Sequence, residues 1–322
     1  MYEIIMMNEK TRKDSVQIMR YELNYPEIAS LRIDKYINEQ IPELSRSFIQ
    51  QLIKNEEVLI NGKVCKANYK CKPSDTIIVE YEEAKELEVV AENIPLDIVY
   101  EDADVVIVNK PKNMVVHPAA GHENGTLVNA LLYHCKDSLS SINGVIRPGI
   151  VHRIDRNTTG ILVVCKNDNA HKNLAEQLKE HSITRKYHAI CHGTFKELEG
   201  TVNAPIGRHP VDRKKMAINH KNGREAITHY KVLATLKDNY SYIECTLETG
   251  RTHQIRVHMA SIGHPLLGDD VYGPRNSKIK GLEGQTLHAK VLGFIHPTSN
   301  EYVEFDSELP EYFQALLDKL CI

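Results

Sequence analysis

The stretch RPGIVHRIDRNTTGILVVCKN, residues 147–167, places one carboxylate among chargeable neighbours. His152, Arg153 and Arg156 surround Asp155, and the apolar run GILVV that follows has the composition of a buried strand. Beside two arginines the carboxylate is expected to be ionised at neutral pH, which suits a nucleophile or a general base and makes it a poor general acid. A salt-bridged turn ahead of a core strand would show the same spacing, so the residues alone leave both interpretations open.

A second polar group lies in ETGRTHQIRVHMA, which reads as a turn followed by a helix. Five side chains within eight positions could bind a charged group: Arg251, His253, Gln254, Arg256 and His258. Arginine is the side chain best suited to hold a carboxylate through two hydrogen bonds or to clamp a phosphate. Three of the five, Arg251, Gln254 and His258, would fit a solvated helix face equally well.

The segment RKYHAICHG reads as a strand in which Tyr187 and Ala189 face inward, because they alternate with Lys186 and His188. A buried tyrosine is usually part of a core with its hydroxyl satisfied. Tyrosine can also stack on a nucleic-acid base while presenting a polar tip. Both roles stay open for Tyr187.

The sequence contains no HExxH, paired CxxC, Walker A, GxGxxG or GxSxG motif. We therefore expect no metal and no cofactor, and a chemistry centred on a carboxylate.

Length and composition favour a two-domain cytoplasmic protein. The chain has 322 residues and seven cysteines, an odd number without a secretory signal, which indicates free thiols in a reducing compartment. No apolar run approaches the roughly 18 residues needed to cross a bilayer, so no membrane association is expected. A monomer is the default expectation.

The net charge of −3 conceals a strong asymmetry. Residues 81–104 hold one lysine against nine acidic residues. Residues 147–225 hold 15 lysines and arginines against eight acidic residues, a local charge of +7. A basic section around Asp155 is what a polyanion-binding face requires, although ordinary surface variation could also produce it.

The pattern of residues 31–92 predicts a small module of two helices followed by a small sheet. The role of residues 1–30 stays open. Ser45 is a suitable N-cap for the second helix, whose inward face would comprise Phe48, Ile49, Leu52 and Ile53. That helix would expose Arg46 and Lys54. The pair Asn61-Gly62 predicts a tight hairpin turn.

The acidic segment 81–95 reads as a linker, and residues 96–322 as a second, larger domain. Strands and helices intermix there without regular βαβ alternation, which favours an α+β fold with a mixed or antiparallel central sheet.

The segment HRIDRNTTGILVVCKN resembles the signature of the RluA-type pseudouridine synthases, H-R-L-D followed by a T-S-G-like turn. Further blocks resemble that family in the same order: NKPKNMVVHPAAGHENGTLVNALL, RKYHAICHG, TGRTHQIRVHMASIGHPLLGDDVYG and LHAKVLGFIHP. The likeness runs from about residue 96 to the end. The module at 31–92 resembles the RNA-binding domain named after the small-subunit ribosomal protein S-four.

The resemblance implies a role for each matching position. Asp155 matches the catalytic aspartate, Tyr187 the active-site tyrosine and Arg256 the arginine that pairs with the aspartate. Arg153 matches the residue that fills the space left by a flipped-out uridine, with His152 beside it in the RNA-binding motif. Arg46 and Lys54 would contact RNA from the small module.

The resemblance therefore predicts a cofactor-independent enzyme that isomerises uridine to pseudouridine in structured RNA. Large-subunit ribosomal RNA is the expected substrate, with transfer RNA as the alternative. Two rivals from other classes stay open: a catalytically silent RNA-binding factor for ribosome assembly, and a hydrolase that uses Asp155 with His152.

Overall fold

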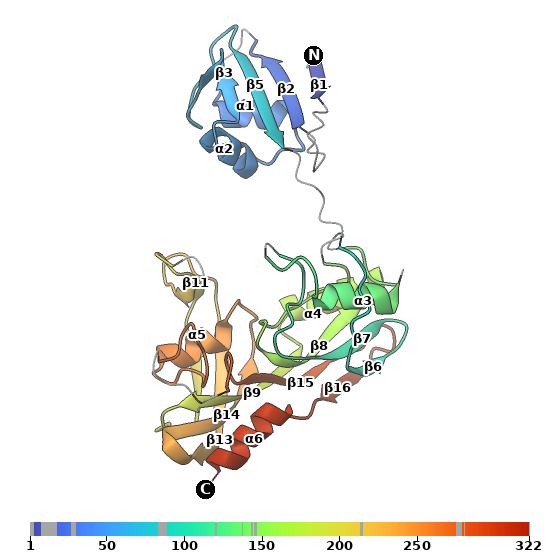
Figure 1. The fold of residues 1–322 in the computed structure, drawn as a ribbon, viewed down its shortest axis with the longest axis vertical. Helices are drawn as coiled ribbons and strands as arrows, with labels where there is room; N and C mark the ends of the chain where they lie inside the picture. The colour runs from blue at the N-terminus through green and yellow to red at the C-terminus, as the bar shows by residue number, and fades with distance from the viewer. Residues whose placement is uncertain are drawn as a thin grey trace. The chain divides into compact units, whose positions relative to one another are not determined.

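The chain forms two compact units, each with its own hydrophobic core (Figure 1). Unit 1 spans Met1–Glu86 and unit 2 spans Leu87–Ile322. This computed structural model describes residues 3–7, 18–26, 30–82, 89–119, 121–136, 138–142, 144, 147–212, 215–274, 279 and 281–321.

Unit 1 is a five-stranded antiparallel sheet with two helices. The strands follow the spatial order β1-β2-β5-β3-β4, with bounds β1 (Glu3–Met7), β2 (Ile18–Asn24), β3 (Val58–Ile60), β4 (Lys63–Val64) and β5 (Thr76–Glu82). Helices α1 (Ile33–Gln40) and α2 (Arg46–Lys54) bury their apolar faces in the same core. The segment 1–30, whose role the sequence left open, supplies β1 and β2 to this sheet.

Most local signals in unit 1 are confirmed. Ser45 caps α2 by accepting a hydrogen bond from the Phe48 backbone N–H at 3.3 Å. Asn61 and Gly62 form the hairpin turn with φ of 49° and 74°. Phe48 is the exception, because its side chain is 38% exposed instead of lying in the core. Its ring packs edge-on against that of Tyr81 on β5, with 5.5 Å between the ring centroids.

The sheet of unit 2 is mixed, as the sequence predicted. Its spatial order is β10-β13-β14-β9-β15-β8-β7-β6, with β16 paired to β15. The bounds are β6 (Ile98–Glu101), β7 (Val105–Lys110), β8 (Thr159–Cys165), β9 (Thr184–His192), β10 (Glu199–Asn203), β13 (Ile227–Leu236), β14 (Tyr240–Leu247), β15 (Leu287–Ile295) and β16 (Tyr302–Asp306). A separate hairpin pairs β11 (Ile206–Arg208) with β12 (Met216–Ile218), and the short η1 (Lys237–Asn239) joins β13 to β14.

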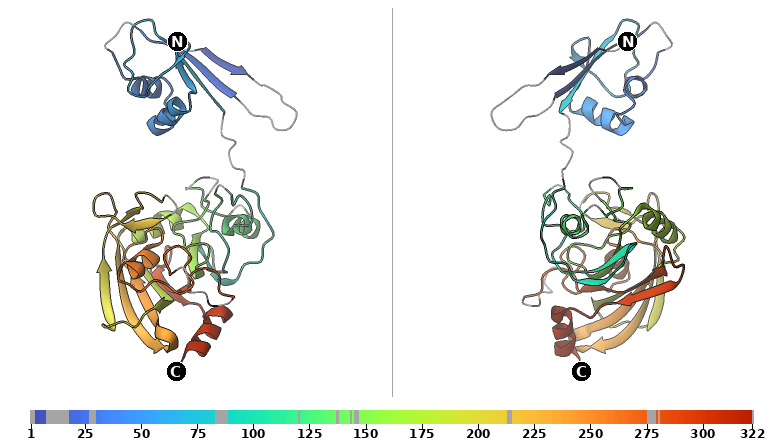
Figure 2. Two further views of the ribbon diagram at one scale, coloured as in Figure 1. Left: turned by 60° about the vertical axis from the view of Figure 1, so that its left-hand side comes forward. Right: turned by 90° about the vertical axis from the view of Figure 1, so that its right-hand side faces the viewer.

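Helices cover both faces of this sheet (Figure 2). On one face lie α3 (Leu127–Cys135) and α5 (Gln254–Ser261), which share a core with Tyr187. On the other face lie α4 (Asp168–Lys179) and α6 (Glu311–Leu320). None of the helices in the described ranges is long and apolar enough to cross a membrane.

Residues 89–95, expected within the linker, pack against the core of unit 2 together with Leu96. Val89, Ile94 and Leu96 contact its hydrophobic cluster, and the Asn129 side chain donates to the Val90 carbonyl at 2.8 Å. Its apolar side chains are partly buried in spite of the acidic composition of the segment, and the compact unit 2 starts at Leu87.

The pairing of β8 with β15 is parallel and joins two antiparallel halves of the sheet. His288 lies opposite Thr159, and Ala289 lies opposite Gly160. Gly160 has φ of +107°, and a Cβ there would lie 2.2 Å from the Ala289 carbonyl oxygen. Only glycine fits this start of β8, which fixes where the preceding loop leaves the sheet.

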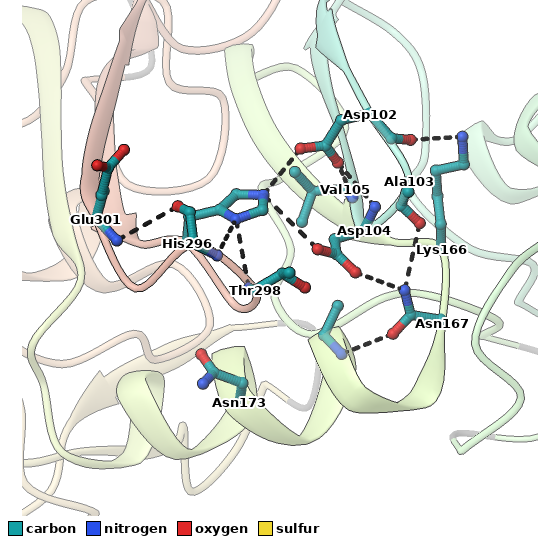
Figure 3. Close-up of polar contacts among 12 residues, drawn as sticks. Asp102, Ala103, Asp104, Val105, Lys166, Asn167, Asn173, His296, Thr298 and Glu301 are labelled. Atoms are coloured by element: carbon teal, nitrogen blue, oxygen red, sulfur yellow. Dashed lines mark hydrogen bonds and ion pairs between the residues drawn. The ribbon is translucent and has the colours of Figure 1, made fainter.

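A polar network holds the opposite end of β8 (Figure 3). His296 donates from Nε2 to Asp102 at 2.8 Å, and the Asn167 side-chain amide donates to Asp104 at 2.8 Å. Asn167 also caps α4 by accepting from the Ala170 N–H at 2.9 Å. The β6–β7 turn, the start of α4 and the end of β15 are thereby tied together.

Candidate active site

Asp155 lies in the loop that enters β8, with its side chain 19% exposed. Its carbonyl accepts a hydrogen bond from the Thr158 N–H at 3.0 Å, which closes a tight turn. The Thr158 hydroxyl in turn accepts from Gln285 at 3.1 Å, and Ile154 is buried in the core. The carboxylate is therefore presented by a loop that is anchored on both sides.

The buried Lys110 supports the same loop through hydrogen bonds to backbone carbonyls. Its ammonium donates to the carbonyls of Pro111 and Met114 at 2.8 Å each and to that of Arg156 at 3.1 Å. Burial lowers the pKa of Lys110 to about 7, partly offset by the charge of Asp155. Arg156, unassigned from the sequence, thus contributes its backbone to the loop support.

Arg256 of α5 bridges two carboxylates. Its Nε and Nη2 donate to Asp269 at 2.7 and 2.9 Å, and its Nη1 donates to Asp155 Oδ2 at 3.0 Å. Burial opposes the charge on Arg256, but the hydrogen bonds and charge of Asp269, followed by those of Asp155, raise its pKa. The two hydrogen bonds to Asp269 fix the plane of the guanidinium group. From that fixed position, Nη1 holds one oxygen of Asp155, Oδ2.

The second oxygen of Asp155 faces His253. The distance from Oδ1 to His253 Nε2 is 3.9 Å, and no hydrogen bond to Oδ1 comes from the described residues. The Tyr272 hydroxyl accepts from the Met216 N–H at 2.8 Å and lies 2.8 Å from His253 Nδ1. Burial lowers the pKa of His253, and the charge of Asp155 acts against that shift.

Tyr187 is buried at the centre of β9, on the same face of the sheet as α5. Burial raises the pKa of its phenol; Arg185 acts against that shift and Asp155 adds to it. The side chain therefore remains a phenol at neutral pH and presents its ring to the space beside Asp155.

A cavity of about 750 Å³ joins these side chains, large enough for a nucleotide. Among the described residues that line it, Asp155 is the one acidic side chain. Seven cations line it as well: Arg147, Arg153, Lys179, Arg185, Arg224, Arg251 and Arg256. Such a wall attracts a polyanion, in keeping with the +7 section of the sequence.

Arg153 is exposed at the cavity, while His152 next to it is held by the backbone. The Arg153 Nη1 donates to Nε2 of the buried His117 at 3.2 Å. Burial, followed by the charges of Arg153 and Arg147, lowers the pKa of His117 to about 4, which keeps it a neutral acceptor. His152, for which RNA contact stays a prediction, also lines the cavity, and its Nε2 accepts from the Val163 N–H at 3.0 Å.

Arg46 and Lys54, expected to contact RNA, belong to α2 of unit 1. The Arg46 guanidinium is bonded to the buried Asp34 at 2.8 Å, and Lys54 is exposed in the last turn. Burial opposes ionisation of Asp34, but hydrogen bonds from Arg46, Gln50 and Arg32 lower its pKa to about 2. Part of the Arg46 charge is thus already neutralised.

Within the described ranges, one group of side chains approaches a metal-binding arrangement, and it lies away from Asp155. Glu101, His134 and Cys135 bring ligand atoms within 4.8 Å of one another. Lys166 already pairs with Glu101 at 2.7 Å, and burial raises the pKa of Cys135 to about 11. Glu101 also pairs with His134 at 2.7 Å, so its carboxylate already has two partners. All seven cysteines are free, as the sequence predicted.

His288, which bonds to Thr159 at the start of β8, should make the stability of the protein depend on pH. His288 is buried between Thr159 and Ser307, with 2.9 Å from a ring nitrogen to each hydroxyl, and burial lowers its pKa to about 4. Between pH 6.5 and 4 the unfolded chain binds a proton here that the folded chain does not, so stability decreases as the pH is lowered through this range. In His288→Gln the slope of unfolding free energy against pH should decrease by up to about 1.4 kcal/mol per pH unit.

Urea denaturation at pH 7, 6 and 5 measures that slope. The matched control is His220→Gln, because His220 is exposed in a turn and should leave the slope of the wild-type protein unchanged. Equal slopes for His288→Gln and the wild type would contradict the prediction.

Comparisons with known proteins identify relatives over most of the chain. The family model of RNA pseudouridylate synthase matches residues 104–261, and that of the S4 domain matches residues 31–77. An RNA pseudouridine synthase of Bacillus subtilis is 53% identical over 291 residues, covering 90% of this chain and 94% of that protein. Ribosomal large subunit pseudouridine synthase D of Zymomonas mobilis is 48% identical over 305 residues, covering 92% of this chain and 96% of its own.

A solved structure extends the agreement to the fold. Human RNA pseudouridylate synthase domain containing 1 superimposes with a TM-score of 0.57 at 27% identity, covering 74% of this chain and 91% of that one. The match of sequence, fold and order of motifs leaves one assignment. The chain belongs to the RluA/RluD family of RNA pseudouridine synthases, with an S4 domain ahead of the catalytic unit.

Proposed function

We propose that this enzyme isomerises uridines of large-subunit ribosomal RNA and that Asp155 is its catalytic carboxylate. The observation that carries the proposal is the single carboxylate in a cation-lined cavity, held through one oxygen by Arg256. Relatives named ribosomal large subunit pseudouridine synthase D, at 48% identity in Zymomonas mobilis and 42% in Salmonella typhimurium, support the choice of RNA.

The reaction breaks the bond between uracil N1 and the ribose C1′, turns the base, joins C5 to C1′ and releases the C5 proton. It changes no oxidation state, so no redox partner enters the balance. Arg256 holds Oδ2 of Asp155, which leaves Oδ1 toward the cavity as the oxygen that attacks or accepts a proton. Because Oδ2 is fixed, rotation of the carboxylate costs the hydrogen bond to Arg256, and Oδ1 stays aimed at the substrate.

The uridine has to leave its base stack to reach Asp155 in the cavity, at a cost of a few kcal/mol. Arg153, exposed above the cavity and oriented by the neutral His117, occupies the space that the base leaves. Tyr187 stacks on the extruded base, and its protonated hydroxyl can donate a hydrogen bond to the uracil while the C5 proton departs.

The substrate assignment is tested with the wild-type enzyme and RNA labelled with tritium at uridine C5. We expect tritium release from large-subunit ribosomal RNA and much slower release from a transfer RNA pool. The order of the two rates decides between the two substrates. Binding of RNA without release from any cellular RNA would favour a silent assembly factor, and free uracil would indicate a hydrolase.

A further inference from the structure

Arg185 is a buried cation without a counter-charge. It lies on β9 two residues before Tyr187, is 5% exposed and lines the cavity of Asp155. Its Nη2 donates to the Glu248 carbonyl at 2.7 Å, while its Nε is buried without a hydrogen-bond partner. No carboxylate within the described part of the chain forms an ion pair with it.

The surroundings of Arg185 add positive charge instead of removing it. Arg251 and Arg224 line the same cavity, and burial followed by the charges of Arg224 and Arg185 lowers the pKa of Arg251, partly offset by Glu225. The Arg251 Nε donates to the Glu225 carbonyl at 2.8 Å, a neutral partner. Three guanidinium groups thus repel one another at one wall of the cavity.

Gly250 shapes the space in front of this wall. A Cβ at that position would lie 2.7 Å from the Arg185 Nη1. Because glycine has no side chain, the guanidinium group of Arg185 has room to lie against the backbone at position 250. Gly250 itself lines the cavity. The chain therefore accommodates a charged group at a position where a neutral side chain would be easier to bury.

Burying a guanidinium with most of its donors unused is strongly unfavourable unless an anion completes the site. We propose that Arg185 is a substrate-binding residue that holds a phosphate next to the extruded uridine, with Arg251 beside it. Arginine donors match phosphate oxygens in pairs, whereas a uracil carbonyl accepts less and carries no charge. The inference rests on the proposed entry of a uridine into the cavity of Asp155.

Thermal unfolding of the full chain with small ligands provides the first test. We expect uridine 5′-monophosphate or uridine 3′-monophosphate to raise the melting temperature of the wild-type protein more than uridine does. In Arg185→Gln this difference should disappear, and in Arg185→Lys part of it should survive, since lysine keeps the charge. Lys319→Gln, an exposed position on α6 outside the cavity, should behave like the wild type.

Kinetics on labelled ribosomal RNA provide the second test. Loss of a charge-assisted hydrogen bond should raise KM for Arg185→Gln at least about tenfold and change kcat less. Equal stabilisation of the wild type by uridine and both monophosphates would overturn the proposal, as would an unchanged KM in a folded Arg185→Gln or Arg185→Lys protein. The nucleotide shifts need no turnover, so they remain decisive even if ribosomal RNA proves to be the wrong substrate.

Discussion

Asp155→Asn should release tritium from labelled RNA at least about a thousandfold more slowly than the wild-type enzyme. The amide has nearly the same shape as the carboxylate and can still accept from Arg256, so the loop and the cavity should persist. What it lacks is the negative charge and the nucleophilicity of Oδ1. Single-turnover tritium release measures the chemical step directly, apart from RNA binding and product release.

The matched control for this substitution is Asp318→Asn. Asp318 lies exposed on α6, where it accepts from Gln314 at 2.8 Å, and the same chemical change there should leave the rate intact. RNA affinity of Asp155→Asn should stay close to that of the wild type, because the seven cations of the cavity are unchanged. Wild-type tritium release by Asp155→Asn would remove Asp155 from the chemistry.

Arg256→Met should lose both stability and activity. Removing the guanidinium leaves Asp269, which is fully buried, without its charge partner, and this should lower the unfolding free energy of unit 2 by about 3–5 kcal/mol. Asp155 also loses the donor that fixes Oδ2. We expect a drop of at least about a hundredfold in tritium release under conditions where the variant is folded.

A double variant separates the two effects. Arg256→Met combined with Asp269→Asn removes the buried unpaired charge, and the amide oxygen can still accept from the Val271 and Tyr272 N–H groups that now bond Asp269. Stability in urea denaturation should recover in part, whereas tritium release should stay low because Asp155 remains unsupported. Recovery of activity along with stability would show that Arg256 matters only for folding.

The sequence predicted those parts of the molecule that depend on near neighbours. The cap at Ser45, the turn at Asn61-Gly62 and the inward face of β9 are confirmed, since each needs only a few adjacent residues. The alternation along β9 could also have identified Arg185, which lies two positions from Tyr187 and therefore on the same side of the strand.

Other parts depend on residues that are remote in the chain. Arg256 and Asp155 are 101 positions apart, so spacing alone could not pair them, and only the family resemblance suggested it. Asp269 had no local signal at all. Gln254 and His258 fitted a solvated helix face, but both are buried. Their helix packs against β13, where both side chains bond to the hydroxyl of Thr228.

The parallel pairing of β8 with β15 has a consequence for how the enzyme comes into being. Thr159 lies opposite His288 across the sheet, so the loop of Asp155 gains support from residues that lie more than a hundred positions later in the chain. Contacts of such long range close a large loop and form late in folding. A growing chain therefore carries all of unit 1 before the strand that supports the loop of Asp155 has been synthesised.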